Sequence, residues 1–193
     1  PPPPPPPFQA EDGIRDIHCS LVGSEMCIRD SYHYGIDRFA EDAKTAGADG
    51  IIVPDLPPEE ADALVAASRK AGLDTIFLVA PTSTGDRIEK IGAVSRGFIY
   101  YVSLAGVTGA RKELASGIAE SVENIREKSA MPVCVGFGIS TPDHVRQVSR
   151  YADGAIVGSA LVGLIEKLHN DPGCTQTVAR FIGDLRAATV RSE

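Results

Sequence analysis

The 193-residue sequence contains no apolar run that approaches 18 residues, and this absence argues against a membrane-spanning helix. It also lacks a basic excess, because 26 Asp and Glu outnumber 19 Lys and Arg and give a net charge of −7. Nucleic acids and anionic membranes bind basic faces, so neither is an expected partner. A small phosphorylated ligand remains compatible with this charge, since backbone N–H groups can hold it.

Cysteine and histidine are too scattered to predict a metal site. The four cysteines, at positions 19, 27, 134 and 174, form no CxxC pair and no Cys/His cluster at zinc spacing. Reduced thiols in a cytoplasmic protein are the simplest interpretation. Cys134 lies within an apolar run and is expected to be a buried, inert thiol. His144 and His169 fall on expected helices, and we expect both to be solvated.

The first 31 residues differ in pattern from the rest of the chain. Seven consecutive prolines favour an exposed polyproline II segment. Residues 8–31 show no sustained strand or helix period and no features of a secretory signal. Their sequence, SLVGSEMCIRDS in particular, resembles translated adapter sequence, and a disordered native tail is the alternative. Both interpretations predict a non-homologous, disordered tail over residues 1–31 and a folded domain over residues 32–193.

From residue 32 onward, short β-branched apolar runs alternate with amphipathic helical stretches. The runs are almost continuously apolar, which is typical of parallel strands covered on both faces. Helix signals lie between them, such as Gly72 as a C-terminal stop and Thr141 as an N-cap followed by proline. The five expected strands are Gly50–Pro54, Thr75–Val79, Phe98–Val102, Pro132–Gly136 and Ala155–Gly158.

The length of each repeat indicates the architecture. Five βα units over residues 32–193 use about 32 residues each, close to the roughly 31 per unit of a complete (β/α)₈ barrel. We therefore predict an α/β fold, a partial (β/α)₈ TIM barrel made of the last five βα units after a disordered proline-rich tail. A doubly wound open sheet is the main alternative. It loses support because the sequence has neither a GxGxxG fingerprint nor a P-loop.

Glycine-bearing turns follow the last three expected strands, at the end where α/β folds bind ligands. A small-residue loop over residues 103–110 follows the first of these strands and could close as a lid. Gly138 lies in the second turn, and Gly158 with Ser159 opens a helix after the third. Glycine often serves only to make a tight connection. Three such turns in successive units favour a phosphate cradle built from backbone N–H groups.

Candidates for general acid/base chemistry are few. Asp55 directly follows the first expected strand, where a carboxylate could face a ligand, and capping of the helix that begins at Pro57 or Pro58 is an equally supported role. Tyr100 and Tyr101 point to opposite faces of one strand, so one is expected to face the interior and the other the helix layer. No Ser/His/Asp set and no metal site can be assembled from the sequence.

Four segments carry a resemblance to a known family: YGIDRFAEDAKTAGADGIIVPDLPPEEA, RGFIYYVSLAGVTGA, PVCVGFGIS and GAIVGSALV. In order and spacing they resemble the α subunit of tryptophan synthase, from Tyr32 to about Ser192. The resemblance implies a lyase of tryptophan biosynthesis that cleaves indole-3-glycerol phosphate to indole and glyceraldehyde 3-phosphate by a retro-aldol reaction. It also implies a cytoplasmic α₂β₂ complex with a β subunit. Pyridoxal phosphate belongs to that β subunit, so no cofactor is expected on this chain.

The same resemblance implies roles for individual positions. Thr108 would belong to a loop that closes over the substrate. Tyr100 and Phe137 would line the indole pocket, and Asp55 would lie near the contact face for the β subunit. The implied phosphate cradle consists of Gly109, Gly138, Gly158 and Ser159.

The departures from the family pattern concern the catalytic residues. The family's catalytic Glu, on its second strand, and its catalytic Asp, in the following loop, have no counterpart here, and Leu104 stands where some members carry Arg. We therefore expect low activity, since each acid/base role contributes on the order of 10²- to 10⁴-fold. The alternatives are a non-catalytic fragment that binds only a phosphate ligand or the β subunit, an assembly product without function, and other phosphate-binding barrels.

Overall fold

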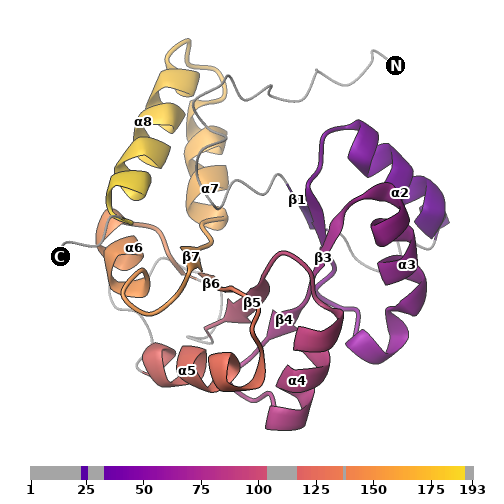
Figure 1. The fold of residues 1–193 in the computed structure, drawn as a ribbon. Helices are drawn as coiled ribbons and strands as arrows, with labels where there is room; N and C mark the ends of the chain where they lie inside the picture. Colours follow the sequence, from indigo (N-terminus) through magenta and orange to yellow (C-terminus); the bar gives the residue numbers. More distant parts are fainter. Residues whose placement is uncertain (1–22, 26–32, 104–116, 137, 190–193) are drawn as a thin grey trace. The chain divides into compact units, whose positions relative to one another are not determined.

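The structure is a computed structural model that describes residues 23–25, 33–103, 117–136 and 138–189. Strands and helices alternate along most of these residues, and the paired strands run parallel (Figure 1). The chain divides into two compact units. Unit 1 comprises Pro1–Phe77 and Val94–Gly97, and unit 2 comprises Leu78–Ala93 and Phe98–Glu193. The α/β class with parallel strands that the sequence predicts is therefore confirmed.

Unit 1 contains a three-stranded parallel sheet in the order β1-β2-β3. Helices α2 and α3 lie side by side (Figure 1) and bury Phe39 and Leu64, while Ile51 is buried in β2. Helix α3 ends at Gly72, whose left-handed φ of +73° confirms the predicted C-terminal stop. The elements are β1 (Gly23–Glu25), α2 (Ile36–Thr45), β2 (Gly50–Ile52), the 3₁₀ helix η1 (Pro58–Glu60), α3 (Asp62–Ala71) and β3 (Asp74–Ile76).

Unit 2 contains a four-stranded parallel sheet in the order β4-β5-β6-β7. Its core includes Ile99, Val133 and Val135 from the strands and Val122 and Ile125 from a helix. Helix α8 packs beside both α6 and α7 (Figure 1). The elements are β4 (Leu78–Val79), α4 (Gly85–Val94), β5 (Ile99–Val102), α5 (Ile118–Lys128), β6 (Val133–Gly136), α6 (Pro142–Val148), β7 (Gly154–Ala155), α7 (Ser159–Leu168) and α8 (Cys174–Ala187).

Three strands differ in position from the sequence prediction. The predicted strand Ala155–Gly158 corresponds to β7 (Gly154–Ala155), which shares only Ala155 with it. The predicted strand Thr75–Val79 is divided, because residues up to Ile76 pair with β2 in unit 1 and residues from Leu78 pair with β5 in unit 2. Gly23–Glu25, which we assigned to the disordered tail, form β1 and pair in parallel with β2. This pairing is made by backbone hydrogen bonds, which do not depend on residue type. A strand of three residues is also too short to show a hydrophobic period in the sequence. The domain boundary at residue 31 stays a prediction.

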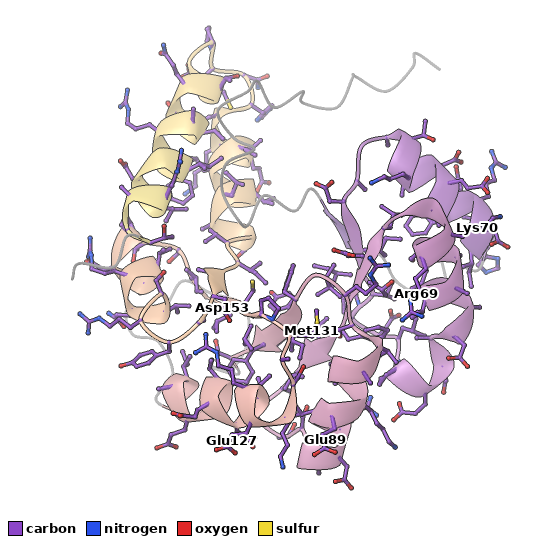
Figure 2. All side chains as sticks on the ribbon, viewed as in Figure 1. Arg69, Lys70, Glu89, Glu127, Met131 and Asp153 are labelled. Carbon is purple, nitrogen blue, oxygen red and sulfur yellow. The ribbon has the colours of Figure 1, made fainter. Side chains whose placement is uncertain are left out.

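Asp153 connects three elements of unit 2 and is labelled in Figure 2. Its carboxylate accepts a hydrogen bond from the backbone N–H of Val133, at the start of β6, at 2.8 Å. It also accepts one from Nη2 of Arg126 on α5 at 2.8 Å. The backbone N–H of Asp153 donates to the carbonyl of Val133 at 2.9 Å. The residue that precedes β7 thus holds the first residue of β6 and supports the register between the two strands.

Across the part of the chain that the structure describes, no helix combines the length and the apolar character needed to cross a membrane. The helices are 14 residues or shorter in this part, and α8 is the one that reaches 14. This agrees with the absence of a long apolar run in the sequence.

Candidate functional site

The carboxyl ends of β5, β6 and β7 lie at one edge of the unit 2 sheet, because the three strands are neighbours and run parallel. Ser103 follows β5, and Gly136 ends β6. Gly138 lies in the connection from β6 to α6, while Gly158 and Ser159 lie where the connection from β7 enters α7. Three of the four residues predicted for the phosphate cradle therefore belong to connections at the same sheet edge.

Both glycines in these connections border space that no other described residue fills. Gly138 has a φ of +76°, a left-handed conformation that glycine adopts without steric cost. Among the described residues, a Cβ added at Gly138 or at Gly158 would meet no atom within 4 Å. Gly158 is also the N-cap of α7 and has no side chain to occupy that helix end. The positive end of the α7 dipole favours an anion at this position.

Tyr100 on β5 packs against Gly136 on β6. Tyr100 is in register with Cys134, so the Tyr100 side chain and a Cβ at Gly136 would project from the same face of the sheet. A Cβ added at Gly136 would lie 2.6 Å from Cζ of Tyr100, far inside van der Waals contact. Glycine at this position therefore leaves room for the ring. Tyr100 is half-buried and Tyr101 is buried, and the indole-pocket role of Tyr100 stays a prediction.

Ser103 and His144 hold the two ends of the connection between β6 and α6. The backbone N–H and Oγ of Ser103 donate to the carbonyl of Gly136 at 3.2 and 3.0 Å. Nδ1 of His144 accepts a hydrogen bond from the backbone N–H of Ser140 at 3.4 Å. Thr141 accepts a hydrogen bond from the His144 N–H at 3.2 Å, which confirms the predicted N-cap.

The expectation that His144 is solvated was wrong. Its relative exposure is 5%, because the ring turns back across the first turn of α6 toward Ser140. His144 is the third residue of α6, the position from which Glu or Gln reaches back in a capping box. A histidine three residues after a threonine N-cap is the sequence signal from which the buried contact of His144 could have been predicted. His169 is exposed and Cys134 is buried, as expected.

The remaining predicted residues divide between unit 1 and the undescribed segments. Asp55 is exposed in unit 1, between β2 and η1. Thr108, Gly109, Leu104 and Phe137 lie outside the described residues, so their roles stay predictions. Within the described ranges, no group of three or more His, Cys, Asp or Glu side chains is placed to hold a metal ion.

Comparison with known proteins identifies the family. The sequence model of the family described as tryptophan synthase alpha chain matches residues 24–190. The chain belongs to the tryptophan synthase alpha chain family. The family member from Roseiflexus castenholzii is 57% identical over 154 residues, which are 79% of this chain and 58% of that protein. The member from Opitutus terrae is 49% identical over 161 residues, which are 83% of this chain and 60% of that protein.

Solved structures of tryptophan synthases are similar in fold. A Mycobacterium tuberculosis tryptophan synthase chain matches with a TM-score of 0.76 and 40% identity, over 87% of this chain and 62% of that chain. A Legionella pneumophila tryptophan synthase alpha chain matches with a TM-score of 0.76 and 35% identity, over 91% and 64% of the two chains. The predicted family and the predicted partial barrel are therefore confirmed. The chain spans about three-fifths of the length of the curated relatives it matches.

Proposed function

We propose that this chain carries the part of a tryptophan synthase alpha site that holds the phosphate and the indole of indole-3-glycerol phosphate. The family to which the chain belongs is a family of lyases of tryptophan biosynthesis, which cleave this substrate to indole and glyceraldehyde 3-phosphate. One observation supports the proposal most strongly. Gly138 and Gly158, in the connections after neighbouring strands β6 and β7, both place backbone beside space that is open among the described residues.

The proposed roles come from the resemblance to the family, and they suit the reaction. A retro-aldol cleavage needs groups that protonate the indole ring carbon, steer the indole N–H and remove a hydroxyl proton. The phosphate lies away from the bond that breaks, so its binding energy positions the substrate. Tyr100 and Phe137 would flank the indole, and Thr108 would belong to the loop that closes over it. The phosphate would be held by Gly109, Gly138, Gly158 and Ser159.

We expect a polypeptide of the 193 printed residues to be a slow catalyst or an inactive one. None of the residues proposed for the phosphate and indole is a carboxylate, and the family's catalytic Glu and Asp have no counterpart in the printed sequence. Each missing acid/base role lowers the rate by a factor on the order of 10² to 10⁴. Binding of the phosphate and loss of turnover are therefore separate expectations.

The proposal also includes a partner. Members of this family act in an α₂β₂ complex, and we propose that the exposed Asp55 in unit 1 lies near the β-subunit contact face. Pyridoxal phosphate would then be bound by the β subunit and not by this chain. The location of the complex would be cytoplasmic.

The first experiment measures turnover. Indole release from indole-3-glycerol phosphate is followed with the purified chain and a tryptophan synthase β subunit. We expect no release above background, and release after the βα units absent from the printed sequence are grafted from a relative. Release near the rate of a complete alpha chain would contradict the expected loss of activity, and would indicate that a carboxylate of this chain, such as Asp55, transfers the proton.

The second experiment measures phosphate binding with sn-glycerol 3-phosphate as the probe. Ser159→Asp places a negative charge at the N-terminus of α7, where it favours the helix but repels phosphate. We expect this variant to bind the probe at least about tenfold more weakly. Thr175→Asp, in the first turn of α8, is the matched control and should bind like the parent chain. Failure of the parent chain to bind the probe, or equal binding by Ser159→Asp, would contradict the phosphate role.

A further inference from the structure

The connection between β6 and α6 is held by two polar side chains that the family resemblance assigns no role. Ser103 and His144 have relative exposures of 2% and 5%. Each contacts the connection at a different end, Ser103 at the carbonyl of Gly136 and His144 at the N–H of Ser140. Gly138, with its left-handed backbone and open Cβ side, lies between the two held ends.

At the first end, the carbonyl of Gly136 receives two donors from one residue. The β5–β6 pairing ends at Val102 and Gly136, and Ser103 continues it through its backbone N–H. The hydroxyl of Ser103 adds a second hydrogen bond at 3.0 Å. The end of β5 therefore holds the residue from which the β6–α6 connection departs.

At the second end, the His144 ring acts as a hydrogen-bond acceptor. Its Nδ1 accepts the Ser140 N–H, so a neutral ring carries its proton on Nε2. The backbone N–H of His144 donates to Oγ1 of Thr141, and this N-cap hydrogen bond fixes the first turn of α6. The hydrogen bond to this buried side chain therefore restrains Ser140 relative to α6. A solvated histidine ring would not restrain it.

We propose that Ser103 and His144 are positioning residues that hold the β6–α6 connection in the conformation that binds the substrate's phosphate. The inference rests on the proposed function of Gly138 and deepens it. Neither side chain has to touch the phosphate. Backbone amides that are already ordered lose less conformational freedom when they bind an anion, so holding both ends raises affinity.

A role in stability alone makes a different prediction. It would lower the free energy of unfolding and leave the affinity of the folded protein for phosphate unchanged. Positioning requires that affinity and the protection of the Ser140 amide change together. It also requires that a side chain with an acceptor at the same place restores both.

The test compares four variants by amide hydrogen exchange and by NMR titration with sn-glycerol 3-phosphate. His144→Leu removes the acceptor, and His144→Asn keeps an oxygen near the place of Nδ1. Ser103→Ala removes the hydroxyl and leaves the backbone donor. Ser68→Ala is the matched control, because Ser68 in unit 1 is buried and its hydroxyl has no hydrogen-bond partner among the described residues.

We expect His144→Leu to weaken probe binding by about three- to tenfold and to speed Ser140 amide exchange by a similar factor, the value of one hydrogen bond. His144→Asn should recover most of both losses. Ser103→Ala should weaken binding by about two- to fivefold, and Ser68→Ala should leave binding unchanged. If His144→Leu does not fold, Ser103→Ala decides the outcome, because an affinity equal to that of the parent chain would then contradict the inference.

The outcomes separate this inference from the proposed function. A parent chain that does not bind sn-glycerol 3-phosphate contradicts the proposed phosphate site and this inference with it. A parent chain that binds, with affinity unchanged in both Ser103→Ala and His144→Leu, contradicts only the inference. Faster Ser140 exchange in His144→Leu with unchanged affinity would assign His144 to stability alone and would also overturn it.

Discussion

At the edge of the unit 2 sheet, packing and backbone conformation restrict which residue type can occupy a position. Gly136 is the clearest case, because the space that its side chain would occupy is filled by the ring of Tyr100. Gly138 is required for a different reason, its left-handed backbone, and Gly158 has neither constraint. Three glycines that look equivalent in the sequence therefore differ in what a substitution would cost.

Gly136→Ala should be destabilising because the new methyl group overlaps the Tyr100 ring, which must leave its position. We expect a loss of about 1 to 3 kcal/mol in the free energy of unfolding, measured by urea denaturation. Gly158→Ala adds the same methyl group next to open space and should change the value by less than about 0.5 kcal/mol. Equal costs for the two substitutions would contradict the packing of Tyr100 against Gly136.

At the scale of elements, the interaction of Asp153 with β6 matters more than its ion pair with α5. The Asp153 and Arg126 side chains are 40% and 43% exposed, so solvent screens the charge interaction between them. Val133 is fully buried, and its backbone N–H donates its hydrogen bond to the same carboxylate. An unsatisfied N–H at that point would cost more than the loss of a surface ion pair.

Two substitutions distinguish these contributions. Asp153→Ala removes the carboxylate that accepts hydrogen bonds from both Val133 and Arg126, and it should lower the free energy of unfolding by about 1 to 3 kcal/mol. Arg126→Met removes only the ion pair and should cost at most about 1 kcal/mol. Both values are measured by urea denaturation. A larger loss in Arg126→Met than in Asp153→Ala would show that the ion pair, and not the hydrogen bond to Val133, holds these elements.

At the scale of the whole molecule, several apolar side chains of α7 and α8 are exposed, although Leu185 on α8 is buried. Val162 and Ile165 on α7 are 63% and 42% exposed, and Ile182 on α8 is 47% exposed. No residue of α7 itself is buried within the described part of the chain, although the helix is rich in aliphatic residues. Contiguous exposed apolar surface favours association, so this pair of helices should limit the solubility of the chain.

We expect the double variant Val162→Glu and Ile165→Lys to associate less than the parent chain at high concentration, measured by sedimentation velocity. Its free energy of unfolding should stay within about 0.5 kcal/mol of the parent, because exposed positions contribute little. Gln176→Glu with Ala179→Lys adds the same pair of charges to exposed sites on α8 and is the control. Unchanged association of the α7 variant, or a marked loss of stability, would contradict the exposure of these side chains.

Local sequence signals predicted many of the elements well. The predicted strands Phe98–Val102 and Pro132–Gly136 agree with β5 and β6 to within one residue. The stop at Gly72 and the cap at Thr141 are also confirmed. These signals succeed because a left-handed glycine, an N-cap oxygen and an apolar run act on their own stretch of backbone.

The sequence by itself determined the family, the parallel α/β class and the glycine-bearing connections after β6 and β7, because these are properties of short segments and their order. Only the tertiary structure decided the division of residues 74–79 between two sheets, the burial of His144, and the dependence of Tyr100 on Gly136. Tyr100 and Ser103 meet Gly136 from positions more than 30 residues away in the chain. Contacts of that kind depend on strand register and packing, which no local pattern encodes.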